Sequence, residues 1–202
     1  MLKTNIAVLV SGGGTNLEHL LLAQEEGRIP HGEITLVISN EPGAYALTRA
    51  ANHGVVSAVV EHRGRTQAEF EAELQSVLVQ NGIRLVILAG FLRILSADFV
   101  AKWPERIINV HPSLIPSFCG AGFYGLKVHE AALARGVKVS GATVHLVNEI
   151  PDGGRILLQK AVAIEPSDTP ETLQRRIMEQ AEWVLLPEAA ELMSKQIMEE
   201  EK

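Results

Sequence analysis

Asn109 and His111 are two polar residues in an otherwise apolar run that ends at Pro112. Because side chains alternate along a strand, both should lie on one face, and Pro112, which lacks a backbone donor, should leave the pair at the strand's exit. A carboxamide donor beside an imidazole can stabilise an oxyanion and move a proton near neutral pH. A buried pair whose hydrogen bonds are made by backbone groups is an equally good interpretation of these residues alone.

A carboxylate that could join this pair is Asp152, in the turn Pro151-Asp152-Gly153-Gly154. The glycines give the backbone freedom to bring Asp152 to His111, where its charge would favour the imidazolium form. An Asp-Gly-Gly sequence is more often only a turn. Asp152 is therefore a catalytic candidate that depends on where the turn folds.

A glycine-rich segment, Ser11-Gly12-Gly13-Gly14-Thr15-Asn16, follows the first apolar run and precedes the first helical pattern. Glycines permit left-handed backbone, and free N–H groups at a helix start can hold an anion, so the segment predicts a phosphate site. It matches the first two glycines of the dinucleotide-binding pattern and lacks the third, and no Gly-Lys-Ser/Thr follows, which excludes a P-loop. The alternative is a tight turn without a ligand, with Thr15 or Asn16 as a helix cap.

Short apolar runs alternate with segments of helical period as far as Pro112. We expect strands over residues 6–10, 34–39, 55–60, 85–89 and 107–110, and helices over residues 16–26, 44–52, 66–80 and 96–102. Continuous apolar strands separated by helices predict an α/β fold, a doubly wound, mostly parallel sheet with helices on both faces. Ligands of such sheets bind beyond the carboxyl ends of the strands, where His111 and the glycine-rich segment fall.

The pattern changes after Pro112. A stretch with glycine and aromatic residues, 113–127, precedes a short helix near 128–135, two strand-like segments over 139–147 and 155–163, and a long helix from Thr169 to the end. Thr169 is a helix cap, and Pro170 suits the first helical position. With no repeat or linker, residues 1–202 are expected to form one domain, with a nucleotide-binding-like half at 1–112 and a second half at 113–202.

Composition and charge narrow the classes of partner and compartment. The formal charge is −6 and no segment concentrates Lys or Arg, so nucleic acid is not expected as a partner. The single cysteine, Cys119, suits a reducing compartment, and the His and Cys residues show no zinc spacing, so no metal is expected. Residues 1–10 are too short an apolar start for a signal sequence or membrane span. A cytoplasmic protein without a membrane partner is predicted.

Four segments together resemble a known family: VSGGGTNL at 10–17, LAGFLRIL at 88–95, NVHPSLIP at 109–116 and DGG at 152–154. In order and spacing they are similar to the phosphoribosylglycinamide formyltransferases, which are folate-dependent, and the similarity spans residues 6–187. The resemblance implies the formyltransferase fold, with a Rossmann-like first part. It also implies transfer of the formyl group of 10-formyltetrahydrofolate to the amine of 5'-phosphoribosylglycinamide (glycinamide ribonucleotide) in de novo purine biosynthesis.

By the same resemblance, Asn109, His111 and Asp152 form the catalytic group. Asn109 and protonated His111 would stabilise the charge that collects on the formyl oxygen in the tetrahedral intermediate. Asp152 would position His111 and help move a proton from the amine to the folate nitrogen, through water. Residues 113–202 are accordingly expected to be the folate and catalytic half.

The resemblance also implies two sets of binding residues. The phosphate end of the substrate would be bound by Gly13, Gly14, Thr15 and Asn16. The other end of the ribonucleotide would be bound by Glu182. The folate, a co-substrate, would be bound, partly through backbone groups, by Leu92, Arg93, Ile94, Leu95, Asn109, Asn148, Glu149, Ile150 and Pro151. Without the family, a Glu on an acidic helix is more often solvated, and Leu92, Ile94 and Leu95 would be ordinary core residues. The chain is expected to be a monomer or a homodimer.

The chain departs from the family in three places. Gln67 stands where the family often has an arginine on the folate side, with Arg65 two residues earlier. The segment 118–127 is longer than in the shorter members, and Arg155 replaces a common proline, so the geometry of the substrate loop is expected to differ. Cys119 lies in this segment and is interpreted as a bystander, because no activating base is evident in the sequence.

Three alternatives stand beside this interpretation. Methionyl-tRNA formyltransferases and formyltetrahydrofolate hydrolases share Asn-x-His and the distant Asp, but usually carry a further domain for which 202 residues leave no room, and the acidic charge disfavours tRNA. A nucleotide-dependent oxidoreductase would explain the glycine-rich segment and Glu41, but not Asn109, His111 and Asp152. A non-catalytic ligand-binding domain is the third.

Overall fold

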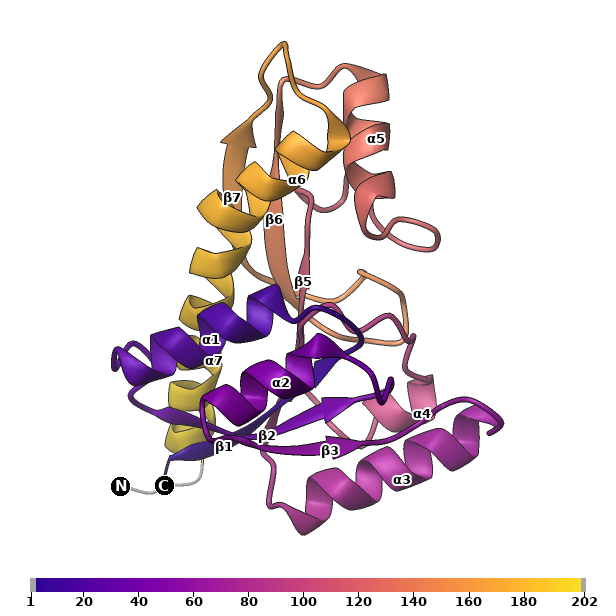
Figure 1. Cartoon of the computed structure of the whole chain (residues 1–202), viewed down its shortest axis with the longest axis vertical. Coiled ribbons are helices and arrows are strands. Elements are labelled where there is room, and N and C mark those ends of the chain that lie inside the picture. Colours follow the sequence, from indigo (N-terminus) through magenta and orange to yellow (C-terminus); the bar gives the residue numbers. More distant parts are fainter. Residues whose placement is uncertain (1–2, 201–202) are drawn as a thin grey trace.

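A seven-stranded sheet forms the centre of the computed structural model, which describes residues 3–200 (Figure 1). The strand order is β3-β2-β1-β4-β5-β6-β7, with β1 Thr4–Val10, β2 Gly32–Ser39, β3 Val56–Val59, β4 Leu85–Leu88, β5 Ile107–His111, β6 Val139–Leu146 and β7 Ile156–Ala163. β1 to β5 pair in parallel, whereas β6 is antiparallel to both β5 and β7. The prediction of a doubly wound, mostly parallel sheet is confirmed.

Helices cover both faces of the sheet, close to the ranges predicted. They are α1 Thr15–Glu25, α2 Tyr45–Asn52, α3 Gln67–Gln80, α4 Ala97–Val100, α5 Leu126–Arg135, α6 Pro170–Ile177 and α7 Trp183–Glu200. Residues of α1, α2 and α7 share one hydrophobic cluster with the sheet, and those of α3 and α4 share another. β1 contributes Val8 to the first cluster and Leu9 to the second, as expected for a strand buried on both faces. Within residues 3–200, no helix is long and apolar enough to cross a membrane.

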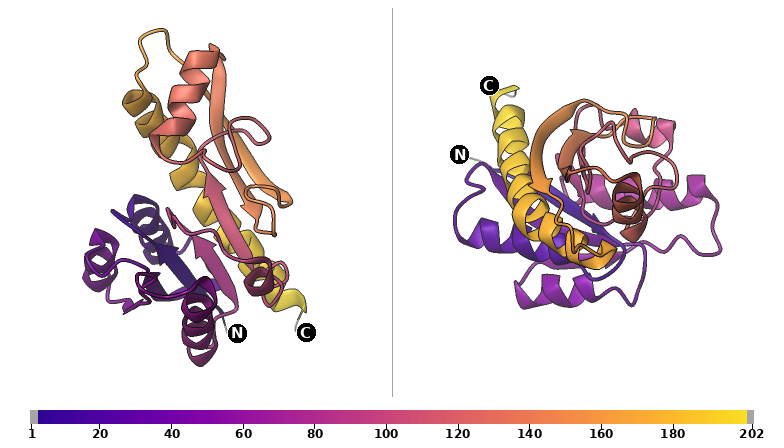
Figure 2. Two further views of the ribbon diagram at one scale, coloured as in Figure 1. Left: turned by 90° about the vertical axis from the view of Figure 1, so that its right-hand side faces the viewer. Right: turned by 90° about the horizontal axis from the view of Figure 1, so that it is seen from above.

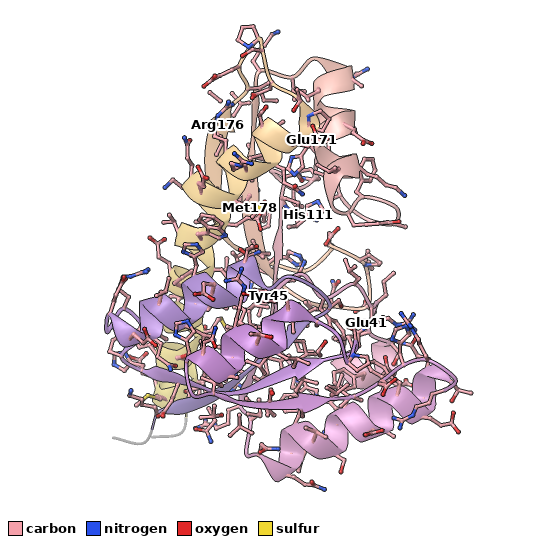
Figure 3. The ribbon with its side chains drawn as sticks, viewed as in Figure 1. Glu41, Tyr45, His111, Glu171, Arg176 and Met178 are labelled. Carbon is pink, nitrogen blue, oxygen red and sulfur yellow. The ribbon has the colours of Figure 1, made fainter. Side chains whose placement is uncertain are left out.

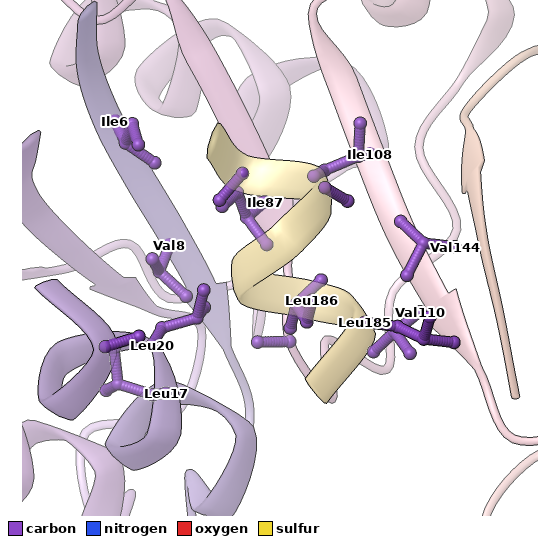
Figure 4. Packing of buried hydrophobic residues seen from close by; sticks show 14 of the residues in the cluster. Ile6, Val8, Leu17, Leu20, Ile87, Ile108, Val110, Val144, Leu185 and Leu186 are labelled. Atoms are coloured by element: carbon purple, nitrogen blue, oxygen red, sulfur yellow. The ribbon is translucent and has the colours of Figure 1, made fainter. Parts of the chain in front are cut away.

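The last helix joins the two parts of the sheet. Leu185 and Leu186 of α7 lie between Val8 on β1 and Val110 on β5 (Figure 4). The side view shows α6 and α7 following one another along the length of the molecule (Figure 2). Because α7 contacts β1 and β2 as well as β6 and β7, it ties the parallel strands to the antiparallel pair that completes the site.

The long helix expected from Thr169 onward is interrupted. A π-helical turn, Met178–Glu182, separates α6 from α7. A π turn accommodates one extra residue and leaves the apolar spacing on either side nearly intact, so the hydrophobic pattern does not show it. The predicted long helix from Thr169 is confirmed over residues 170–200, but the π-helical turn within it was not predicted. Its last two residues, 201 and 202, lie outside the described part of the chain, as do residues 1 and 2 of the predicted apolar start.

Local sequence explains several element boundaries. Thr169 accepts a hydrogen bond from the Thr172 N–H and begins α6 as the predicted cap. Gly14, which precedes α1, has a φ of 72°, and a Cβ there would lie 2.6 Å from Ala46 Cβ. Only glycine suits this turn, which fixes the approach of β1 to α1 and the direction of the first helical N–H groups.

Candidate active site

The carboxyl ends of β4 and β5 open into one cleft of about 680 Å³. Its walls come from the start of α1, the loop after β4, the end of β5, the loop 147–152 and the π-helical turn. Among the sequence-predicted site residues, those in the lining are Thr15, Asn16, Leu92, Arg93, Ile94, Leu95, Asn109, His111, Asn148, Glu149, Ile150, Pro151, Asp152 and Glu182. Gly13 and Gly14 do not line the cleft. His111 and Met178 lie near the middle of the molecule in Figure 3, where the cleft is found.

The three predicted catalytic residues meet in this cleft. Asp152 Oδ2 lies 3.4 Å from His111 Nδ1, so the turn at 151–154 folds over the end of β5. Asp152 Oδ1 lies 3.5 Å from Nε2 of His145, and that same nitrogen is 3.1 Å from Asn109 Nδ2. The four side chains therefore form one continuous polar cluster.

The proton positions on His111 follow from its neighbours. His111 Nε2 is 2.9 Å from the carbonyl oxygen of Phe118, and a carbonyl can only accept, so Nε2 carries a hydrogen. The nitrogen that gains or loses a proton is therefore Nδ1, which faces Asp152. This is the arrangement expected of a group that exchanges a proton inside the cleft.

Burial lowers the pKa of His111 below its usual value, and His145 nearby acts in the same direction. The charge of Asp152 and the Phe118 carbonyl raise the pKa, as expected from the sequence, but burial has the larger effect. The sequence led us to expect a protonated imidazole. In the structure the neutral form is favoured instead, because the ring is 4% exposed and loses most of its hydration.

Opposing effects also act on the pKa of Asp152, but here burial does not decide the direction of the shift. Burial alone would raise its pKa, but the neighbouring His145 and the hydrogen bond from the Gly120 N–H, at 2.8 Å from Oδ2, lower it, as does the charge of His111. The pKa of Asp152 therefore lies below its usual value, and the carboxylate is ionised at neutral pH. An ionised base next to a buried imidazole can accept a proton that passes through His111 or through water.

His145 was not singled out from the sequence, although it completes the cluster. It lies on β6 directly opposite Asn109 on β5. The signal was present: Thr143 and His145 are polar residues at i and i+2 in an apolar strand, the pattern that marked Asn109 and His111. What sequence could not provide is the antiparallel register that places the two pairs side by side.

The segment predicted to be a longer loop contributes backbone groups to the cluster. The Phe118 carbonyl and the Gly120 N–H bind His111 and Asp152, and Phe118 has a φ of 51°. Cys119 between them is 3.3 Å from the Pro116 carbonyl oxygen, and burial raises the pKa of its thiol, as does Asp152. A raised pKa disfavours the thiolate, which agrees with the interpretation of Cys119 as a bystander.

At the other end of the cleft, Asn16 and Glu182 form a pair. Asn16 Nδ2 donates to Glu182 Oε2 at 2.7 Å. Glu182 is 6% exposed, so the solvated carboxylate that an acidic helix suggested is wrong, and the π-helical turn is what brings it inward. Burial raises the pKa of Glu182, while the bond from Asn16 lowers it. The pair offers one donor and one acceptor group for a polar ligand.

Gly13 and Gly14 precede Thr15 and Asn16 at this end of the cleft but do not line it. The Gly13 carbonyl accepts from Arg49 Nε at 2.8 Å, and the Gly12 carbonyl accepts from the Ala46 N–H at 3.0 Å. Two consecutive carbonyls of the glycine-rich segment are thus held by α2, away from the start of α1. These contacts fix the turn from which α1 begins, and the first N–H groups of a helix are left without intrahelical partners, so a phosphate site at this helix start stays a prediction.

The loops that the resemblance assigns to the folate form the third wall. Leu92 and Ile94 are exposed apolar side chains, and Ile150 on the opposite loop is exposed too. Ordinary core packing is therefore wrong for Leu92 and Ile94, and holds for Leu95, which belongs to the cluster under α3. An exposed apolar rim is unusual in a small protein and suits a flat, partly apolar ligand.

Gln67, at the position of the family's arginine, binds the protein itself. Its amide nitrogen donates to the Ile94 carbonyl at 2.9 Å and to Glu71 Oε1 at 2.7 Å, and its oxygen lies 3.3 Å from Arg93 Nη2. Arg65 forms an ion pair with Glu73 on α3. Gln67 therefore fastens the loop after β4 to α3, and Arg93 is the cation of this region that lines the cleft.

The fold and the cleft define a class: a doubly wound α/β protein with a His-Asn-Asp cluster beside a glycine-rich turn at the carboxyl edge of its sheet. A sequence model of the formyl transferase family matches residues 4–189. The chain belongs to this family.

Individual relatives are similar over nearly the whole chain. The trifunctional purine biosynthetic protein adenosine-3 of Gallus gallus is 42% identical over 193 residues, which are 95% of this chain and 18% of that protein. The chloroplastic phosphoribosylglycinamide formyltransferase of Arabidopsis thaliana is 38% identical over 87% of this chain and 61% of its own length. The chain thus spans less than two thirds of these relatives. The crystal structure of glycinamide ribonucleotide transformylase 1 from Symbiobacterium toebii superposes with a TM-score of 0.89 at 40% identity, covering 96% of this chain and 89% of that one.

Proposed function

We propose that this chain transfers the formyl group of 10-formyltetrahydrofolate to the primary amine of 5'-phosphoribosylglycinamide, a step of de novo purine biosynthesis. The observation that carries the proposal is the meeting of Asn109, His111 and Asp152 in one cleft between a glycine-rich turn and an apolar rim. The relatives named for glycinamide ribonucleotide formyl transfer support this choice of substrate.

The substrates would occupy opposite ends of the cleft. The first turn of α1, with Thr15 and Asn16, would take the phosphate, and Glu182 would accept hydrogen bonds from the rest of the ribonucleotide. The folate would lie between the loop 92–95 and the loop 148–151, against Leu92 and Ile150. This arrangement leaves the amine and the formyl carbon at the His111 cluster.

The reaction exchanges one C–N bond for another. The amine attacks the formyl carbon, and negative charge collects on the formyl oxygen, where Asn109 Nδ2 would donate to it. His111 Nδ1 would donate as well once it has taken up a proton from water, which it would release again when the oxyanion collapses. A positive charge on His111 is costly in this buried position, but it becomes favourable once the oxyanion forms beside it. The charged ring would therefore stabilise the transition state more than the bound substrates. The bond to folate N10 then breaks, the amine nitrogen loses a proton through Asp152 and water, and N10 gains one.

The remaining expectations belong to the same proposal. The acidic charge and the single cysteine support small-molecule substrates, no nucleic-acid partner and a cytoplasmic location. Monomer and homodimer remain the two open assembly states. Cell fractionation with an antibody to the chain tests the location, and light scattering tests the assembly.

An absorbance assay tests the reaction. Purified protein is mixed with 10-formyltetrahydrofolate, and the folate spectrum is followed with and without 5'-phosphoribosylglycinamide. The proposal predicts conversion only when the amine substrate is present. Conversion in its absence would identify a hydrolase, and no conversion in either mixture would overturn the proposal.

A further inference from the structure

One hydroxyl joins the two binding segments of the cleft. Ser11, at the end of β1, begins the glycine-rich turn, and its Oγ accepts a hydrogen bond from the Leu92 N–H at 2.9 Å. Leu92 belongs to the loop after β4, the strand that pairs with β1. The contact bridges residues far apart in sequence, and it lies where the two loops leave neighbouring strands.

Asn40 fixes the orientation of the Ser11 hydroxyl. Ser11 Oγ lies 2.6 Å from Asn40 Oδ1, an oxygen that can only accept, so the single hydroxyl proton is given to Asn40. Asn40 is 4% exposed, and its amide nitrogen is 3.1 Å from His62 Nδ1. Because the proton is committed to Asn40, a lone pair of Oγ is directed at Leu92. A chain of hydrogen bonds thus connects His62, through Asn40 and Ser11, to the backbone of the folate-side loop.

Each segment also has an anchor of its own. Arg49 holds the glycine-rich turn through the Gly13 carbonyl, and Gln67 holds the loop after β4 through the Ile94 carbonyl. Within residues 3–200, no side-chain hydrogen bond joins Arg49 to the loop after β4 or Gln67 to the glycine-rich turn. Ser11 is part of the turn and binds the loop, so it links the positions of the two.

We infer that Ser11 is a positioning residue that couples the binding of the two substrates. The inference rests on the proposed function, in which the turn holds the ribonucleotide phosphate and the loop holds the folate. A ligand that orders either segment also orders the other through this hydrogen bond, and by linkage the effect is the same in both directions. A single neutral hydrogen bond corresponds to a coupling of about 3- to 10-fold in affinity.

Calorimetry with an unreactive pair tests the inference. Tetrahydrofolate has no formyl group to give, so it can occupy the cleft together with 5'-phosphoribosylglycinamide without turnover. The Kd of each ligand is measured alone and with the other saturating. The wild-type chain should bind each ligand about 3- to 10-fold more tightly when the other is present. Ser11→Ala should bring that ratio close to 1, and Ser11→Thr, which keeps the hydroxyl, should restore it.

Two matched variants distinguish a loss of coupling between the two ligands from weaker binding of one ligand. Arg49→Met should weaken the ribonucleotide alone, and Gln67→Met should weaken the folate alone, each with the coupling ratio of the wild type. Ser11→Cys, close in size and a poorer acceptor, repeats the test if Ser11→Ala does not fold. Unchanged coupling in the folded Ser11 variants, or independent binding in the wild type, overturns the role of Ser11. Failure of the wild type to bind either ligand would instead overturn the proposed function.

Discussion

Among the histidines that face carboxylates, His53 and His111 have pKa values that move in opposite directions. His53, at the end of α2, lies 2.6 Å from Glu25 and 3.3 Å from Glu18 on α1, and hydrogen bonds to these carboxylates raise its pKa. His111 lies 3.4 Å from Asp152, yet its pKa is lowered. Burial lowers the pKa of both rings, but only at His111 does it exceed the effect of the carboxylate.

The difference shows that a carboxylate neighbour does not by itself define a charged histidine. The His53 side chain is 13% exposed, and its partners Glu25 and Glu18 are 54% and 27% exposed. The side chains of His111 and Asp152 are 6% and 14% exposed, so the pair in the cleft has lost more of its hydration. A buried neutral imidazole beside an ionised carboxylate is poised to become charged only when a new negative charge appears. The tetrahedral intermediate of the proposed reaction would supply such a charge, which is the role proposed for His111 and Asp152.

Replacement of Asp152 should have the largest effect. Asp152→Asn keeps the size of the side chain but removes the base and the charge that raises the pKa of His111, so kcat should fall about 10²–10⁴-fold. The KM for the ribonucleotide should change little, because Thr15, Asn16 and Glu182 are untouched. Steady-state kinetics measures both constants. Turnover near the wild-type level would remove Asp152 from the mechanism.

Asn109 should come next. Asn109→Ala removes the donor that the proposed mechanism directs at the formyl oxygen, and loss of one such donor typically lowers kcat about 10²–10³-fold. Asn109 also contacts His145, so the histidine resonances of the folded variant serve as the control for local rearrangement. A loss that appeared in KM alone would show that Asn109 binds substrate and does not stabilise the intermediate.

The pH titration of the two rings sharpens the comparison without kinetics. Followed by NMR in one sample, the pKa of His53 should lie above 6.5, the ordinary value of histidine, and that of His111 below it. In Asp152→Asn the pKa of His111 should fall further, while His53 stays in place as an internal control. If both rings titrate on the same side of 6.5, burial is not what distinguishes them.

The smallest effect is expected at the surface pair. Because the pKa of His53 is raised on folding, its ion pairs stabilise the folded chain below the unfolded pKa, and this stabilisation is lost as the pH rises through the folded pKa. His53→Gln should therefore lower the free energy of unfolding by at most about 1 kcal/mol at pH 5 and by less at pH 8. Urea unfolding at the two pH values measures the difference. A larger loss at pH 8 would contradict the assigned sign.

The comparison also shows what sequence could and could not predict. Strands such as β1 and β4 were predictable because they are apolar on both faces, and Asn109 and His111 stood out against that background. The partnership of His145 with Asn109 depends on an antiparallel register, and the inward direction of Glu182 depends on a π turn; neither leaves a mark in residue spacing. The Phe118 and Gly120 contacts are made by backbone groups, whose positions side-chain identity does not encode.

The central claim is best tested by following the formyl carbon. The wild-type chain is given 10-formyltetrahydrofolate labelled with carbon-13 in the formyl group, together with 5'-phosphoribosylglycinamide, and the label is followed by NMR. The account predicts that the label moves to the formamide of the ribonucleotide, and that Asp152→Asn slows this movement. Label recovered as formate, or label that stays on the folate while both substrates are bound, would contradict it.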